Sequence, residues 1–252
     1  MAAFRHLITV PLSIASFVGV FYAIAKLMVF LSLPVKIPIH QVWIVNLLDD
    51  WTKLETALLP LTTDAILIVL FILPHSFLKS SFFKYIWDQI GLTSASRSFY
   101  NLVTSATLLL LTQKWERVPS ATLWNIDVES SQVFYWVYFT VHFLAWLIIY
   151  GGSIVMDLPE LTGVKQVYYD WNNLLPPLNY KSYELNVLYE HVRHPSFIGF
   201  SIILWFPNIM SLDRLLLAIL WTTYMFIAWR TDARDVAYQR QQLERKKNKL
   251  LK

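Results

Sequence analysis

The chain has 252 residues, of which 56% are hydrophobic and 15% are charged, with a net charge of +4. A soluble globular domain carries about a quarter charged residues, so the composition excludes an ordinary soluble domain and indicates a protein whose solvent is lipid. The absence of cysteine excludes disulfides, thiolate metal sites and lipid attachment at a cysteine. We therefore expect an all-α fold, a polytopic bundle of transmembrane helices that forms a single integral membrane domain over residues 1–252.

The first two thirds of the chain contain four apolar segments that are candidate membrane spans. A helix needs about 20 apolar residues to cross about 30 Å of hydrocarbon. The third segment is short and must borrow flanking polar residues, whereas the first has no convincing cleavage site and is interpreted as a retained span. The four segments are Leu7 to Leu33, Ala57 to Leu73, Phe99 to Leu111 and Val133 to Met156.

Two more apolar runs, Phe197 to Met210 and Leu215 to Trp229, are separated only by Ser211 to Arg214. Such a tight link predicts a helical hairpin. The tail over residues 230–252 has no Gly or Pro and is rich in strong helix formers. We expect it to be a basic helix that extends the last helix, so the predicted fold is four spans plus a C-terminal helical hairpin.

The positions of Lys and Arg predict the orientation, because short basic loops stay on the cytosolic side. The tail alone has eight basic and three acidic residues, a net of +5. With the N-terminus inside, the outer loops hold only Lys36, Lys53, Lys114 and Arg117, and the inner segments hold Arg5, Lys79, Lys84, Arg97, Lys165, Lys181 and Arg193. Both termini are therefore predicted on the inner side.

Three polar residues inside the apolar segments are costly in lipid and hence informative. Asp64 and His75 are eleven residues apart, about 16 Å along a helix, and cannot touch each other. We expect each to meet a neighbouring helix, or to be a helix-end group that contacts water or a carbonyl. His142 is expected to make an interhelical hydrogen bond. A metal site is not predicted, because metal binding needs three or four converging ligands.

The most specific local sequence lies where the chain re-enters the membrane, around Pro195. Proline favours the first turn of a helix, so Arg193 and His194 are placed at the helix N-terminus, where cationic groups are unfavourable. An anionic partner would relieve this. The hairpin brings Asp232 and Asp235, which share one helix face, to the same membrane level. We expect one polar cluster there, either a set of interfacial ion pairs or a ligand pocket.

Arg-His-Pro followed by an aromatic residue and a glycine, here Phe197 and Gly199, resembles the isoprenylcysteine carboxyl methyltransferase group of membrane enzymes. In that fold the segment and the inner end of the last helix enclose S-adenosylmethionine. The second half of that signature, an adjacent Glu-Glu pair with Gly and Tyr residues, is absent here. The resemblance implies that S-adenosylmethionine, if bound, contacts Arg193, His194, Asp232, Asp235 and Tyr238.

A closer resemblance covers nearly the whole chain. The sequence is similar to the nurim family of multi-pass inner nuclear membrane proteins, itself distantly related to the methyltransferase fold. The resemblance implies a fold and a place, the inner nuclear membrane, but no biochemical activity. It is carried by Asp64 with His75-Ser76, Arg97 to Tyr100, His142 with Trp146, Glu160 to Tyr169, Arg193-His194-Pro195, Asp213 to Ala218 and the basic tail.

These observations lead to competing functional hypotheses. The first is a non-catalytic nuclear-envelope component, embedded in the lipid bilayer, whose tail contacts anionic lipids or other nuclear-envelope proteins and no specific nucleic acid. The alternative is an S-adenosylmethionine-dependent methyltransferase acting on a lipidated or lipid substrate, in which alignment of the methyl group with the nucleophile supplies most of the rate. A third is a chromatin or lipid tether that uses the basic tail.

The distribution of basic residues generates a testable prediction of topology. Both termini should face the nucleoplasm or cytosol, because the tail carries a net +5. An N-glycosylation acceptor sequence placed after residue 252 should remain unmodified when the protein is made in cells. Glycan attachment at that tag would show a lumenal C-terminus and contradict the prediction.

Overall fold

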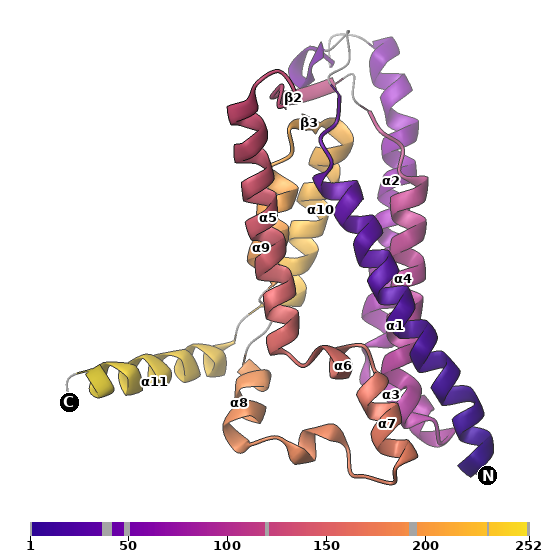
Figure 1. Ribbon diagram of the computed structural model, residues 1–252. Coiled ribbons are helices and arrows are strands. Elements are labelled where there is room, and N and C mark those ends of the chain that lie inside the picture. Colours follow the sequence, from indigo (N-terminus) through magenta and orange to yellow (C-terminus); the bar gives the residue numbers. More distant parts are fainter. Residues whose placement is uncertain are drawn as a thin grey trace.

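The computed structural model describes residues 2–36, 42–47, 51–118, 121–191, 196–230 and 232–250. Within these residues, three helices are long and apolar enough to cross a membrane: α1 (Ala2–Ser32), α2 (Trp51–Leu78) and α5 (Gln132–Val155). They correspond to the first, second and fourth predicted spans. The expectation of a helical membrane bundle is thus confirmed (Figure 1).

The third predicted span is α4 (Ser96–Lys114), a helix of 19 residues. It is longer than its apolar core and includes polar residues at both ends, as the sequence predicted. At 1.5 Å per residue it rises about 28 Å, nearly the thickness of the hydrocarbon layer. It packs against both α1 and α2, so the three helices form one side of the bundle (Figure 1).

The predicted hairpin is present but its first arm is shorter than expected. Helix α9 (Ser196–Trp205) ends five residues before Met210, and a short strand, β3 (Ile209–Ser211), leads into α10 (Leu212–Ala228). The break has a physical cause: Pro207 lacks a donor and disfavours helical backbone at the residue before it. A ten-residue helix rises about 15 Å, so this arm alone does not cross the hydrocarbon layer.

A small sheet, which the sequence did not predict, joins three connections at one end of the bundle. Strand β2 (Ala121–Asn125) lies between β1 (Val42–Trp43) and β3, parallel to the first and antiparallel to the second. We call this end the sheet end. Strands of two or three residues are too short to show an alternating pattern. Their partners also lie about 80 or more residues away in the sequence, so the pairing cannot be predicted locally.

The opposite end, which we call the terminal end, holds both chain ends and several short helices (Figure 1). Its connections are helical rather than extended. They are α3 (Ser81–Gln89), η2 (Thr93–Ala95), α6 (Leu158–Leu161), α7 (Val164–Trp171), η3 (Pro177–Tyr180) and α8 (Tyr183–His191). Helix α7 packs against the start of α1, so the polar stretch after α5 returns across this end of the bundle.

The basic tail is helical, but it does not extend the last helix as predicted. Helix α10 ends at Ala228, and the tail forms a separate helix, α11 (Ala233–Leu250), bent by 79° from α10. Asp232 explains the new start, because its carboxylate accepts hydrogen bonds from the backbone N–H groups of Arg234 and Asp235, each at 2.9 Å. A side-chain cap of this kind begins a helix.

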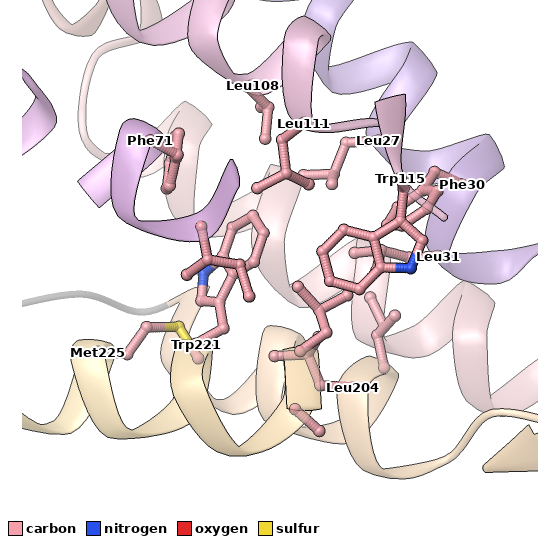
Figure 2. Close-up of a cluster of buried hydrophobic side chains, with 14 of the residues drawn as sticks. Leu27, Phe30, Leu31, Phe71, Leu108, Leu111, Trp115, Leu204, Trp221 and Met225 are labelled. Carbon is pink, nitrogen blue, oxygen red and sulfur yellow. The ribbon is translucent and has the colours of Figure 1, made fainter. Parts of the chain in front are cut away.

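The core lies where α1, α2, α4, α5, α9 and α10 meet, and Figure 2 shows part of it. Leu27, Leu111, Leu217 and Met225 are each at most 2% exposed, although they come from three different helices. Burial of such side chains contributes about 1.5–3 kcal/mol each when the reference state is water. In lipid the outer faces stay apolar too, so the helices associate mainly through close packing.

At Gly199 the backbone of α9 lies very close to α5. A Cβ atom at this position would lie 2.6 Å from the carbonyl oxygen of Ala145 and 2.6 Å from a side-chain carbon of Ile149. The backbone oxygen cannot move aside as a flexible side chain can. The glycine is therefore needed for packing of these two helices.

We predict that Gly199→Ala destabilises the protein by about 1–3 kcal/mol, the usual cost of inserting a methyl group into a packed interior. Gly151→Ala, in α5, is the matched control, since its Cβ would meet nothing within 4 Å. Removing a helical glycine there should be neutral or stabilise by up to about 1 kcal/mol. Thermal unfolding in detergent measures both; equal melting temperatures for the two variants would show that α9 and α5 are not in close contact.

Candidate functional site

Asp232 and Asp235, two of the residues predicted to form a polar cluster, lie where α8 meets α11, at the terminal end. Nδ1 of His191, the last residue of α8, is 2.9 Å from a carboxylate oxygen of Asp235, whose side chain is fully buried. The ring of His191 stacks on Tyr238, with centroids 4.7 Å apart and planes 19° apart. Asp235 and Tyr238 share one face of α11 because they are three residues apart.

The two aspartates also form a reciprocal cap at the start of α11. Asp232 accepts from the N–H of Asp235, and the second oxygen of Asp235 accepts from the N–H of Asp232 at 2.9 Å. This is the arrangement of a capping box, which satisfies N–H groups that a helix terminus would otherwise leave unpaired. Both oxygens of Asp235 are therefore engaged, one by His191 and one by the backbone.

The structure brings three of the five predicted site residues together, namely Asp232, Asp235 and Tyr238. The other two, Arg193 and His194, lie outside the described residues, so their predicted pairing with the aspartates stays a prediction. His191 is the residue that the sequence reasoning missed. A cationic residue at the C-terminal end of a helix is favourable, but the sequence does not show which carboxylate it meets.

A second polar cluster fixes α8 to the rest of the terminal end. Lys165 pairs with Asp157 at 2.5 Å, and Lys181 pairs with Glu160 at 2.5 Å and with Asp157 at 3.5 Å. Partial burial opposes ionisation, but the hydrogen bond and charge of Lys165 and the charge of Lys181 lower the pKa of Asp157. The ammonium of Lys181 also lies 4.1 Å from the ring centroid of Tyr189. These pairs connect the end of α5 to α7, η3 and α8.

Comparison with known proteins decides the family. Over 99% of both chains, the sequence is 49% identical to a nurim homolog of Drosophila pseudoobscura pseudoobscura. It is 37% identical to nurim of Danio rerio over 81% of this chain and 73% of the relative. It is also 35% identical to nurim of Sus scrofa over 95% of this chain and 94% of the relative.

The chain belongs to the nurim family. No family model and no solved structure matches it. The resemblance inferred from its sequence strings is therefore confirmed by relatives that cover almost its full length, and the polar positions within those strings can now be described in this nurim-family chain.

The intramembrane polar residues of this nurim-family chain each meet a neighbouring segment. This was the prediction for His142 and one of the two alternatives for Asp64 and His75. Asp64 accepts from the N–H of Glu116 at 2.9 Å. The hydroxyl of Tyr100, on α4, is 3.0 Å from Nε2 of His75. The ring nitrogens of His142 lie 2.8 Å from the hydroxyl of Ser32 and 3.0 Å from a carbonyl of the segment after α9. These hydrogen bonds link neighbouring segments, because a polar group in lipid must find its partner within the protein.

The predicted hairpin link contains a buried acid and a buried base. Asp213 accepts from the indole of Trp115 at 2.9 Å, from the N–H of Val118 at 3.0 Å and from the hydroxyl of Ser211 at 2.6 Å. Arg214 donates to a carbonyl of α1 at 2.7 Å. Both side chains are inaccessible to solvent, so the link is part of the interior. Within the described residues, no three His, Asp or Glu side chains converge as metal ligands would.

The pair of His191 with Asp235 generates a testable prediction on detergent thermal stability. Asp235→Asn should cost about 1–3 kcal/mol, because it weakens a buried charge-assisted hydrogen bond and leaves His191 without its carboxylate. His191→Gln added to it should then cost much less than it does alone, giving a coupling of about 0.5–3 kcal/mol.

The matched control for this cycle combines His191→Gln with Glu244→Gln. Glu244 is exposed on the same helix, nine residues or about 13 Å further on. These two changes should be additive within about 0.5 kcal/mol. Additive losses for His191 and Asp235 as well would mean that α8 and α11 do not meet through this pair.

Proposed function

We propose that this nurim-family chain is a non-catalytic, multi-pass component of the inner nuclear membrane, with both termini in the nucleoplasm or cytosol. Membership of the nurim family supports this location, because the family that the sequence resembles is one of inner nuclear membrane proteins. The charge distribution supports the orientation. Both chain ends and the basic tail share the terminal end, while the sheet end carries few basic residues (Figure 1).

The observation that carries the non-catalytic part of the proposal is the use of Asp235. A methyltransferase of the implied kind would place an acidic residue near the ammonium or ribose of S-adenosylmethionine. Here Asp235 is fully buried and its two oxygens accept from His191 and from the backbone of Asp232. Because this side chain has no exposed surface, a cofactor could contact it only after the junction of α8 and α11 opened. The burial of Asp235 therefore supports a non-catalytic role.

A second residue of the methyltransferase resemblance also has a structural explanation. Gly199 matches the glycine of that signature, yet its close approach to Ala145 and Ile149 requires a glycine for helix packing alone. The string Arg193-His194-Pro195 is the feature that favours the alternative function, a methyltransferase acting on a lipidated or lipid substrate. A resemblance to the methyltransferase fold therefore does not by itself assign methyltransferase activity to this chain.

The first test is the location of the full-length protein. A fluorescent fusion should give a nuclear rim that remains after detergent extraction of the outer membranes, and immunogold labelling should place it on the inner nuclear membrane. Deletion of residues 240–252 should leave the rim largely intact, because the cluster from Arg245 to Lys249 is a weak basic motif on an exposed helix. A uniform endoplasmic reticulum distribution of the full-length protein would contradict the proposed place.

The second test is equilibrium binding of S-adenosylmethionine to the purified, detergent-solubilised protein. We expect no saturable binding in the micromolar range, because the buried carboxylate of Asp235 is already engaged. Arg193→Ala is the matched variant, since it removes the residue that the resemblance assigns to the cofactor. Micromolar binding that is lost in this variant would overturn the non-catalytic proposal in favour of the methyltransferase.

A further inference from the structure

A pocket at the terminal end lies outside both the α8–α11 junction and the predicted cofactor residues. Its volume is about 410 Å³, within the range of small-molecule sites. It opens between the end of α2, the start of α4 and the segment after α5. Its wall includes Lys79, Lys84, Arg97, Met156 and Leu161.

The pocket is strongly cationic. Among the described residues no carboxylate lies within ion-pair distance of Lys79, Lys84 or Arg97. All three side chains are exposed. The one acidic residue in the wall, Glu160, is already paired with Lys181. Three positive charges around one cavity repel each other, so the site is electrostatically suited to an anion.

Arg97 is held in place while part of its guanidinium stays available. Its Nε donates to the carbonyl of Leu161 at 3.1 Å, and its guanidinium carbon is 5.5 Å from the ring centroid of Tyr100. Neither contact uses the two terminal nitrogens. An oriented guanidinium of this kind binds phosphate through paired N–H groups, whereas lysine acts as a point charge.

The position of the pocket decides between a lipid and a soluble ligand. Lys79 follows the last residue of α2, and Met156 follows the last residue of α5, so the cavity lies at the boundary of the apolar layer. Its wall also contains three leucines, Leu78, Leu161 and Leu178. The headgroup of a lipid at this depth would meet the three cations. The glycerol and acyl carbons of the same lipid would meet the leucines.

We propose that this pocket binds the phosphate-bearing headgroup of an anionic membrane lipid. Basic pockets between transmembrane helices on the cytosolic side are the expected sites of such lipids. The site is built from the transmembrane bundle itself, and the basic tail is not needed for it. The tail is an exposed helix whose charges offer attraction to any anionic surface, whereas the pocket combines charge, an oriented guanidinium and an apolar wall.

The proposal is tested with full-length protein in detergent, titrated with short-chain phosphatidylinositol phosphate. The triple variant Lys79→Gln, Lys84→Gln and Arg97→Gln should weaken binding about a hundredfold, since three basic contacts are lost. Its thermal unfolding without lipid should match the unchanged protein, because none of the three residues is buried. If the triple variant fails to fold, Lys84→Gln alone should weaken binding about fivefold.

The matched control removes the same charge from α11 through Lys246→Gln, Lys247→Gln and Lys249→Gln. This variant should bind the lipid about as well as the unchanged protein. Short-chain phosphatidylcholine should not compete, and the soluble inositol bisphosphate headgroup should bind at least about tenfold more weakly than the lipid, because it lacks contacts with the apolar wall. Equal weakening by the two triple variants, or a soluble headgroup that binds as tightly as the lipid, would overturn the proposal.

Discussion

The carboxylate of Asp213 lies inside an apolar bundle, where lipid offers no hydrogen bonds and the protein must supply them all. It receives three, from the Trp115 indole, the Val118 backbone and the Ser211 hydroxyl. The neighbouring Arg214 donates to a carbonyl near the end of α1. This acid and base therefore hold together α1, the segment after α4, strand β3 and the start of α10. Breaking the arrangement would leave uncompensated buried charges, which is strongly unfavourable.

Much of the architecture at the sheet end depends on this constraint. The segment from Trp115 to Val118 is held from two sides. Asp64 on α2 accepts a hydrogen bond from one backbone N–H group of this segment, and Asp213 accepts one from another. Strand β2 comes next among the described elements and pairs with β3. The last residue of β3, Ser211, donates a hydrogen bond to the carboxylate of Asp213. Helix α9 can therefore end early, at Trp205, because the extended chain after Pro207 finds its backbone partners in the sheet. The two halves of the bundle, seen in Figure 1 as α1, α2 and α4 beside α5, α9 and α10, converge at this end.

The terminal end has a different character, since its polar groups are gathered in small clusters at the boundary of the apolar layer. At the α8–α11 junction, carboxylates that a methyltransferase would use for its cofactor serve instead to start a helix and to hold His191. In the pocket between α2, α4 and α6, basic side chains have no acidic partners among the described residues. In this nurim-family chain the first arrangement supports a structural role for Asp232 and Asp235, and the second supports the proposed recognition of lipid. Both follow from the same rule, that charges near a membrane are stable only when paired or hydrated.

The sequence by itself determined the approximate bounds of α1, α2 and α5, because span length and composition are local properties. It also indicated that His142, deep in its span, would bond to another helix. The family could be inferred too, from strings spread along the chain. The tertiary structure decided what depends on distant partners. The small sheet, the burial of Asp213, the separate helix α11 and the pairing of His191 with Asp235 each require contacts between segments far apart in sequence, whose geometry no local pattern encodes. Asp232 and Asp235 show the difference clearly: their spacing placed them on one face, but only the folded chain showed that they cap a new helix.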